Sequence, residues 1–168
     1  VVLGYAFTQD PQTTKGQLPA PVFPAGTFSG KPLNFYHFPG HTANLPELQG
    51  AAAGAGHFSI EPDSDGILRR VPMLAESKEE GYYESLSLAM VRKIIGSPEI
   101  IPGYGETAIK ATDYSGLEWL QIGPLRVPVD SDGVTSLIPY RGGERSFKYV
   151  SAVDVIIERV YVADLKGK

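Results

Sequence analysis

Residues 54–74 read Gly-Ala-Gly-His-Phe-Ser-Ile-Glu-Pro-Asp-Ser-Asp-Gly-Ile-Leu-Arg-Arg-Val-Pro-Met-Leu and carry the clearest local pattern in the chain. Polar and apolar residues alternate over residues 57–60, as in a half-buried strand. The Asp-Ser-Asp-Gly sequence at residues 63–66 follows, where carboxylates can bond their own backbone and glycine can adopt a positive φ. An extended pattern then resumes and ends near Pro72, because proline has no N–H to donate to the hydrogen-bond ladder of a central strand. This stretch therefore predicts a β-hairpin that turns at residues 63–66.

A second stretch repeats the pattern. Residues 130–139 read Asp-Ser-Asp-Gly-Val-Thr-Ser-Leu-Ile-Pro, and they match residues 63–72 in the turn, in the aliphatic residue after it and in the closing aliphatic-proline pair. Residues 125–129 would supply the incoming strand. Two copies are fewer than the about three stacked units that a solenoid needs. We therefore expect two similar β-hairpins within one sheet, turning at residues 63–66 and 130–133.

The rest of the chain favours a mixed β-sheet flanked by helices. The apolar run at residues 1–7 predicts a strand buried on both faces, and residues 117–122 predict a short strand. Helical spacing of apolar residues predicts a helix over residues 82–95, and a short helix is expected near Pro46. Residues 152–160 predict a third helix with Ser-Ala-Val-Asp as its capping box and with inward-facing side chains at Val153, Ile156, Ile157 and Val160. This order of elements indicates an α/β or α+β fold.

Two proline- and glycine-rich stretches predict loops. Residues 8–29 show little periodicity and predict a long loop. Residues 97–113 predict a second loop, with a short strand at residues 107–111. The aromatic-rich residues 34–41 are irregular, and they suit either a loop packed on the sheet or the lining of a pocket.

Composition excludes several classes of function. The chain has 168 residues, of which 42% are hydrophobic, and a net charge of −4, which fits one globular domain and offers no basic face for nucleic acid. It has no cysteine, so disulfides, thiol catalysis and cysteine-ligated zinc are excluded. The sequence has no apolar run of the about 18 residues that a transmembrane helix needs. The chain begins without methionine, on a strand that is expected to be buried. We therefore expect that the chain is a truncated piece of a longer protein.

Searches of the sequence for catalytic and metal-binding motifs give no match. If Gly66 stands at position six of an EF-hand loop, Pro72 falls at position twelve, where a bidentate glutamate is required. His37 and His41 are separated by Pro-Gly, which excludes the helical spacing of a zinc site. The chain has no Gly-x-Ser-x-Gly and no phosphate loop, and its Gly-Ala-Gly at residues 54–56 precedes a strand, not a helix. We expect no cofactor, no metal and no catalytic residue.

The two arginines after the first turn differ in predicted burial. Alignment of the two repeats places Arg69 on the aliphatic strand face and Arg70 on the other face. We therefore expect Arg69 to be partly buried and paired across the hairpin with Glu61, Asp63 or Asp65. A structural ion pair is the favoured interpretation and a ligand-facing arginine is the alternative. If the pair is buried, its loss should destabilise the domain strongly.

A set of short motifs runs from residue 45 to residue 168. The set comprises Leu-Pro-Glu-Leu at 45–48, the glycine-rich strand and turn at 51–60 and 62–74, Ser-Leu-Ser-Leu-Ala at 85–89, Ile-Gly at 122–123, Val-Pro-Val-Asp at 127–130, Gly133, Leu-Ile-Pro-Tyr-Arg-Gly at 137–142, Phe147, Tyr149, Ser-Ala-Val-Asp-Val at 151–155 and Leu-Lys-Gly-Lys at 165–168. In this combination the chain resembles the CHASE2 sensory domain.

The resemblance implies a non-catalytic sensor that lies outside the cytoplasmic membrane, in the periplasm or the extracellular space. In this family the parent is a membrane-anchored bacterial receptor whose output domain is an adenylate or guanylate cyclase, a histidine kinase or a related enzyme. Residues 1–168 would form a single domain that lacks its N-terminal part and its final strand. The implied partners are a small-molecule or protein signal and a second copy of the parent receptor, with no nucleic acid and no cofactor.

Six residues are candidates for the ligand site: His57, Asp63, Asp65, Arg69, Arg70 and Arg141. The same residues could instead hold the hairpins in register, and His57 alone in a strand is interpreted first as a hydrogen-bonded structural residue. Two other functions stay open on the sequence. One is a secreted hydrolase with two carboxylates within about 10 Å of each other, and the other is a binding or adhesion module with no switching role.

Overall fold

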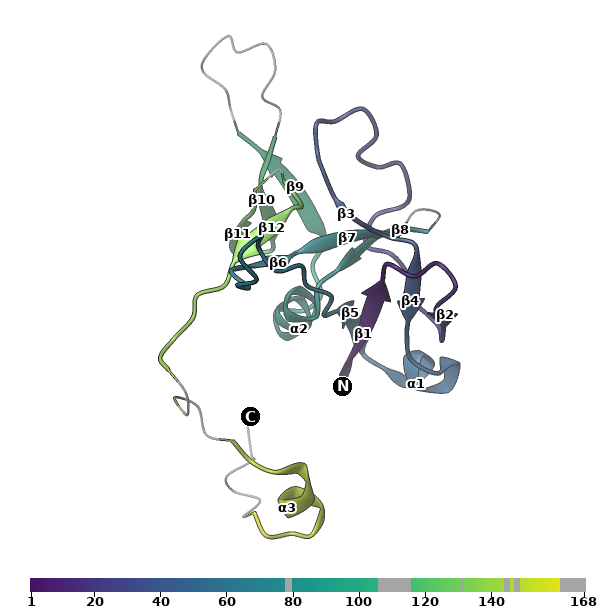
Figure 1. Ribbon diagram of the computed structural model, residues 1–168, viewed down its shortest axis with the longest axis vertical. Helices are drawn as coiled ribbons and strands as arrows, with labels where there is room; N and C mark the ends of the chain where they lie inside the picture. The colour runs from purple at the N-terminus through teal and green to yellow at the C-terminus, as the bar shows by residue number, and fades with distance from the viewer. Residues whose placement is uncertain (78–79, 106–115, 131, 144–145, 147–148, 161–168) are drawn as a thin grey trace. The chain divides into compact units, whose positions relative to one another are not determined.

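The structure, a computed structural model, describes residues 1–77, 80–105, 116–130, 132–143, 146 and 149–160 (Figure 1). The chain divides into two compact units, Val1–Ile138 and Pro139–Lys168. All the described strands and the helices α1 (Pro46–Ala51) and α2 (Leu86–Ile94) belong to the first unit. The second unit contains α3 (Ala152–Ile156).

The described residues of the first unit form four sheets, the largest of which contains the predicted N-terminal strand. The order of strands in this sheet is β2 (Thr14–Lys15), β4 (Gly40–Thr42), β1 (Val2–Thr8) and β5 (Gly54–His57). β1 is antiparallel to β4 and parallel to β5, so the sheet is mixed. This arrangement confirms the predicted α/β or α+β class and places β1 in the interior of the sheet. The prediction that β1 is buried on both faces is wrong, because its two buried residues, Tyr5 and Phe7, share one face and the others are only partly buried.

Three smaller sheets complete the unit. Their strands are β3 (Tyr36–Phe38), β6 (Arg70–Pro72), β7 (Leu74–Ser77), β8 (Gly81–Glu84), β9 (Ile100–Tyr104), β10 (Leu117–Ile122), β11 (Leu125–Pro128) and β12 (Thr135–Leu137). β7 lies between β3, which is parallel to it, and β8, which is antiparallel. β9, β10 and β11 form an antiparallel meander, and β6 pairs antiparallel with β12.

The two Asp-Ser-Asp-Gly segments close as predicted, but the strands beside them pair with other partners. At the first, the Asp63 N–H donates to the Ile67 carbonyl oxygen at 3.0 Å, and at the second the Asp130 N–H donates to that of Thr135 at 3.1 Å. β5 nevertheless pairs with β1, and β11 pairs with β10. The two hairpin ladders are therefore replaced by one pairing, in which the strands that follow the two turns, β6 and β12, bond to each other.

Proline and competing partners account for this difference. Pro62 has no N–H to donate to a ladder, and the residues between β5 and the first turn form no strand. β11 is joined to β10 by a short connection at residues 123–124, so its bonding edge is occupied locally. β6 and β12 are left without a partner strand close in the sequence. They share the same aliphatic-proline pattern, and each supplies the backbone hydrogen-bond partners of the other.

The helices differ from their predicted bounds in ways that capping explains. α2 begins after Ser85, whose side-chain oxygen accepts the Leu88 N–H at 3.3 Å, so it is shorter than the predicted residues 82–95. Tyr82 and Tyr83 lie in β8 instead, because adjacent aromatic residues suit a strand. α1 has proline at its start, as predicted.

The predicted capping box and inward face of the third helix are wrong. Ser151 makes no side-chain capping bond, and α3 ends at Ile156, whereas residues 152–160 were predicted. Within the second unit Val153, Ile156 and Ile157 are exposed. Among the described residues of this unit, no helix or strand other than α3 is present to cover them.

Four strands lie where the sequence indicated loops or irregular chain: β2, β3, β4 and β9. Three of these have two or three residues, too few to show a period. β9 contains Pro102 and Gly103, which are depleted in strands, and this composition hid it. The strand predicted at residues 107–111 lies outside the described residues.

Two clusters of buried side chains form the core of the first unit. β7 joins them, because Leu74 belongs to one cluster and its neighbour Ala75, on the opposite strand face, to the other. The first cluster packs α2 against β9 and β10, and it includes Leu74, Leu88, Ile100, Leu117, Leu120 and Ile122. The second is aromatic and packs β1 against β3 and β8, through Tyr5, Phe7, Phe38 and Tyr83.

Gly56 lets β5 approach the start of α2. A Cβ at this position would lie 2.6 Å from the Leu86 N and Cα atoms, which are backbone and cannot move aside cheaply. The Gly-Ala-Gly of residues 54–56 therefore serves close packing of strand and helix. None of the helices in the described ranges has the length and apolar content needed to cross a bilayer.

Candidate functional site

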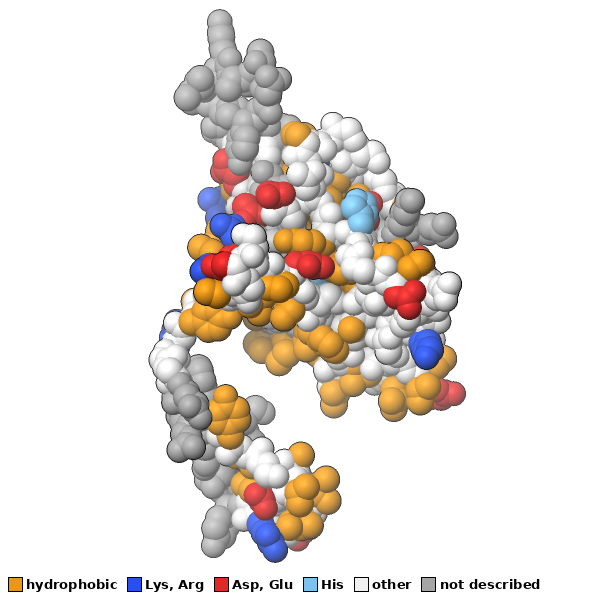
Figure 2. Space-filling model, in the orientation of Figure 1, with side chains coloured by type: hydrophobic (Ala, Val, Ile, Leu, Met, Phe, Trp, Pro, Cys, Tyr) orange, Lys and Arg blue, Asp and Glu red, His pale blue; other side chains and the backbone are white. Residues whose placement is uncertain are grey.

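Four of the six candidate residues come together where the two turns meet. The antiparallel pairing of β6 with β12 sets Arg70 opposite Leu137 and brings the two repeated turns to one flank of the first unit. Figure 2 shows acidic and basic side chains gathered side by side on this flank. We call it the paired-turn site and define it as Asp63, Asp65, Arg69, Arg70 and, from the second turn, Asp130 and Thr135.

Among the described residues, the side chain of Arg69 bonds to carboxylates of its own turn. Its Nη1 donates to Asp63 Oδ2 at 2.8 Å and to Asp65 Oδ1 at 2.9 Å, and its Nη2 donates to Asp65 Oδ2 at 2.8 Å. These bonds, with Asp65 contributing most and Asp63 next, raise the pKa of Arg69, and the pKa of Asp65 is lowered chiefly by Arg69 and then by the Ile67 N–H. The predicted ion pair is confirmed. It braces the turn.

The predicted burial of Arg69 is wrong. Its side chain is 45% exposed and that of Arg70 is 46% exposed, so the two arginines do not differ. The aliphatic face that was expected to cover Arg69 is incomplete, because Ile67 is itself 52% exposed. An exposed pair of this kind contributes little to stability, since water and salt screen it.

Arg70 bonds to the other turn. Its Nη1 donates to Asp130 Oδ2, which ties the start of β6 to the residues before β12. Asp130 is also held by Thr135, whose N–H donates to Oδ1 at 3.2 Å and whose Oγ1 donates to Oδ2 at 2.9 Å. The carboxylate of Asp130 is thus fixed in place by its own turn, with Arg70 as one further partner.

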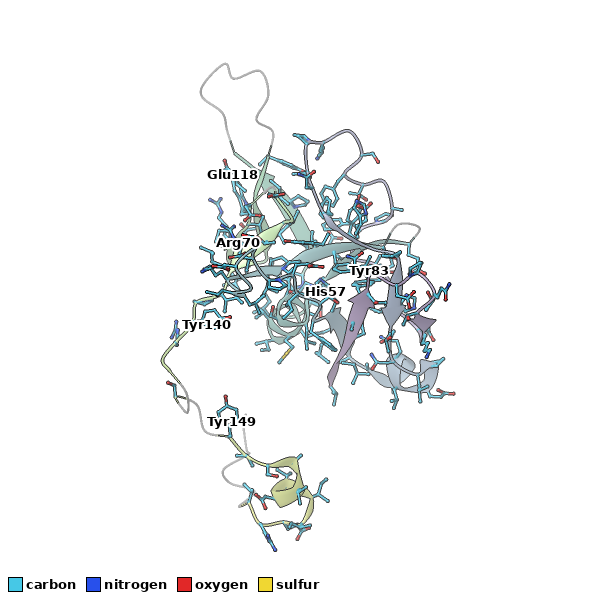
Figure 3. The ribbon with its side chains drawn as sticks, in the orientation of Figure 1. His57, Arg70, Tyr83, Glu118, Tyr140 and Tyr149 are labelled. Carbon is cyan, nitrogen blue, oxygen red and sulfur yellow. The ribbon has the colours of Figure 1, made fainter. Side chains whose placement is uncertain are left out.

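A small pocket opens beside the Arg70–Asp130 pair and is lined in part by Arg70, which Figure 3 labels. Its cavity volume is about 260 Å³, which is below the range of about 300–1,000 Å³ usual for drug-sized ligands. Pro128, Val129 and Leu137 line it together with Thr135, Ser136 and the ion pair. The pocket therefore combines both signs of charge, two hydroxyl-bearing residues and an apolar wall.

The second turn carries backbone strain next to this pocket. Gly133 has a φ of 84° and Val134 a φ of 49°, and a positive φ is costly for a β-branched residue. Val134 is fully buried in the first core cluster. Packing therefore holds Thr135 and Asp130 in a conformation that the local sequence alone would not favour.

His57 lies away from this site, in the interior of the first unit (Figure 3). It is 1% exposed, and within the described chain neither ring nitrogen has a hydrogen-bond partner. Burial lowers its pKa to about 4, against a smaller opposing effect from the Ser59 backbone. His57 is buried as expected of a structural histidine, but the expected hydrogen bonds are not formed within the described chain. Because it is buried, His57 is unsuited to contact a ligand.

Arg141 is exposed and belongs to the second unit, so it is not part of the group that the first unit assembles. The structure adds one arginine site that the sequence reasoning missed. Arg92 of α2 binds the buried Glu84 of β8 with Nε–Oε2 and Nη2–Oε1 distances of 2.8 and 2.5 Å. No local motif could have revealed this ion pair. Glu84 lies in β8 and Arg92 in α2, whereas the sequence predicted one helix over both residues.

Little in the described residues suits hydrolysis or metal binding. Each of three pockets in the first unit has a single carboxylate in its wall, from Glu80, Glu99 or Asp130. Among the described residues, no group of three or more histidine, aspartate or glutamate side chains is placed to hold a metal ion.

Comparison with known proteins gives one result. The family profile of the CHASE2 domain matches residues 2–168, which is essentially the whole chain. No curated protein and no solved structure matches the sequence.

Proposed function

Because this chain belongs to the CHASE2 domain family, we propose that it is the signal-sensing domain of a membrane-anchored bacterial receptor, which controls a cytoplasmic nucleotide cyclase or histidine kinase. CHASE2 domains are extracellular sensory domains of signalling receptors and are not catalytic by themselves. The observation that carries the proposal is the match to this family over residues 2–168.

The paired-turn site supports the sensory role physically. A signal can pass only if its ligand binds one arrangement of the domain better than another. The Arg70–Asp130 pair joins two residues that are 60 apart in the chain and links the strand after the first turn to the second turn, so a ligand that replaces this pair changes what holds these segments together. β12 follows the second turn and ends at Leu137, two residues before the second unit begins at Pro139.

Output of the full-length receptor tests the switching role. Arg70→Gln and Asp130→Asn each break the link between the turns and should change the basal activity of the output domain in membranes by severalfold. Arg126→Gln, at an exposed arginine of β11 that stacks on Trp119 and lies outside the paired-turn site, serves as the control and should leave basal output unchanged. Equal output from all three variants, each shown to be folded, would indicate a binding module with no switching role.

Labelling of intact cells tests the location. The chain has no cysteine, so a single Glu47→Cys substitution on the exposed side of α1 gives one reporter in this domain. A membrane-impermeant maleimide should label that position in intact cells, with the unsubstituted receptor as background. Labelling only after lysis would place the domain in the cytoplasm and remove the proposal.

A further inference from the structure

Arg70 differs from the other paired arginines in how much of its guanidinium is used. Arg92 makes two bonds to Glu84 and a third to the Pro98 carbonyl oxygen, and Arg69 makes three bonds to two carboxylates. Within the described residues, Arg70 makes one side-chain bond, from Nη1 to Asp130. Since a guanidinium has five N–H donors arranged as a fork, Arg70 retains donors for a further planar acceptor.

Asp130 is equally suited to exchange its partner. The Thr135 N–H and hydroxyl already position both of its oxygens, so the carboxylate stays in place when Arg70 turns to another anion. A carboxylate that two donors fix at a pocket wall can accept a bond from an incoming ammonium group.

We propose that the pocket beside Arg70 and Asp130 binds a small zwitterion, an α-amino acid with a short apolar side chain. The α-carboxylate bonds to the guanidinium of Arg70, the α-ammonium bonds to the carboxylate of Asp130, and the side chain packs on Pro128, Val129 and Leu137. This inference rests on the proposed sensory function and names the chemical class of its signal.

Charge balance favours a zwitterion over a simple anion. Inserting one negative and one positive group between Arg70 and Asp130 leaves every charge paired. A monocarboxylate would pair Arg70 but leave Asp130 without a cation, and a phosphate would add a second negative charge beside that carboxylate. An amine alone would leave Arg70 unpaired.

The size and walls of the pocket limit the side chain. The cavity volume of about 260 Å³ lies below the range of about 300–1,000 Å³ for larger ligands. Its wall opposite the charges is aliphatic, so a branched or straight aliphatic side chain fits its chemistry. No further charged side chain lines the pocket among the described residues, so an acidic or basic amino acid would gain no pairing.

Titration calorimetry of the 168-residue chain with L-valine tests the proposal. Two analogues each lack one charge: 3-methylbutanoate has no ammonium, and 2-methylpropan-1-amine has no carboxylate. L-valine should bind, and each analogue should bind weaker by about tenfold or more, as expected for the loss of a charged hydrogen bond. Glycine, L-alanine and L-leucine complete the panel and report the contribution of the apolar wall.

Matched variants assign the binding to these residues. Arg70→Gln and Asp130→Asn should each weaken L-valine binding by about tenfold or more, and the asparagine still accepts from Thr135. Arg126→Gln, at an exposed arginine of β11 that does not line the pocket, should change the affinity by less than about twofold. Thermal melting of each variant verifies that it is folded, and Arg70→Gln alone decides the matter if Asp130→Asn is unfolded.

Several outcomes would overturn the proposal: no binding by any of the four amino acids, equal binding of the single-charge analogues, or wild-type affinity in folded Arg70→Gln. If the amino acids do not bind while receptor output still responds to the turn variants, the zwitterion site fails and the sensory role stands. If they bind and receptor output does not respond, the sensory role fails and the binding site stands.

Discussion

Two arginine–carboxylate pairs in the first unit perform different tasks because they differ in burial. Arg92 and Glu84 have side chains that are 19% and 7% exposed, and the arginine makes two bonds to the carboxylate. Arg70 and Asp130 are 46% and 34% exposed and share one bond at the rim of a pocket. The same two residue types therefore make a fixed structural brace in one place and an exchangeable contact in the other.

The cost of losing a partner decides the difference. A buried carboxylate that loses its cation keeps its charge but has no water to solvate it, whereas an exposed carboxylate is solvated at once. Selection for binding can therefore act on Arg70 with little effect on stability. Arg92 is constrained by the fold.

Replacing the buried arginine should have the largest effect. Arg92→Met should lower the free energy of unfolding by about 4 kcal/mol, because it leaves Glu84 buried without its partner. Urea denaturation at neutral pH measures the change. Arg70→Met is the matched control, and a control that destabilises as much as Arg92→Met would contradict the distinction between the two pairs.

The double variant sharpens the same test. Arg92→Met combined with Glu84→Leu removes both charges from the interior and should recover most of the lost stability, since a buried ion pair is often replaceable by apolar packing. A double variant as unstable as Arg92→Met would show that the loss comes from packing or from the bond to Pro98, not from the stranded charge.

Acid should destabilise the interior before it affects the paired turns. The pKa of His57 is lowered from 6.5 to about 4 in the folded chain. Between these values the unfolded chain binds a proton that the folded chain does not, so stability is full above pH 6.5 and falls as the pH drops toward 4. The gap corresponds to a loss of up to about 3 kcal/mol.

A pH series of urea denaturation curves checks this sign. His57→Phe should flatten the profile between pH 6.5 and 4, since phenylalanine suits the aromatic surroundings next to Phe7 and does not titrate. An unchanged slope in His57→Phe would assign the acid sensitivity to other groups.

The two turn glycines should differ although their backbone conformations are alike. Gly66 and Gly133 have φ of 79° and 84°, so alanine is strained at both. A Cβ at Gly133 would also lie 2.5 Å from the ring of Tyr36, whereas nothing lies within 4 Å of a Cβ at Gly66. We expect a loss of about 1 kcal/mol for Gly66→Ala and about 2 kcal/mol for Gly133→Ala. Thermal melting measures both, and equal losses would mean that Tyr36 moves aside freely.

The sequence was informative where a single residue type dictates local chemistry. Glycine and aspartate placed both turns, proline placed the start of α1, and the apolar run placed β1, because each acts through its own backbone or immediate neighbours. The partners of Arg69 were predicted for the same reason, since they lie within six residues of it.

What the sequence could not predict depends on contacts between distant segments. The pairing of β6 with β12 joins residues more than 60 apart in the chain, and the sequence of neither strand indicates which strand it will pair with. The Arg70–Asp130 contact and its pocket exist only because of that pairing. The burial of Arg92 and the exposure of Arg69 likewise follow from which elements cover them, and a face inferred from alternation alone does not say what lies opposite.

The smallest effect is expected at Arg69, and it isolates what an exposed pair contributes. Arg69→Gln should shift the melting temperature far less than Arg92→Met, because the side chain is 45% exposed and water replaces its three bonds. A local readout should nonetheless change. The pKa of Asp65 is lowered first by Arg69 and then by the Ile67 N–H, so in the variant it should rise without reaching its ordinary value.

NMR titration of the Asp65 carboxyl in both chains measures that rise. A pKa rise that is measurable while the loss of stability stays small is expected of a solvated pair, because linkage ties the two changes together and water screens both. Should Arg69→Gln unfold the chain as readily as Arg92→Met, exposure would not be what separates the two kinds of pair, and the exchangeability of Arg70 would lose its physical basis.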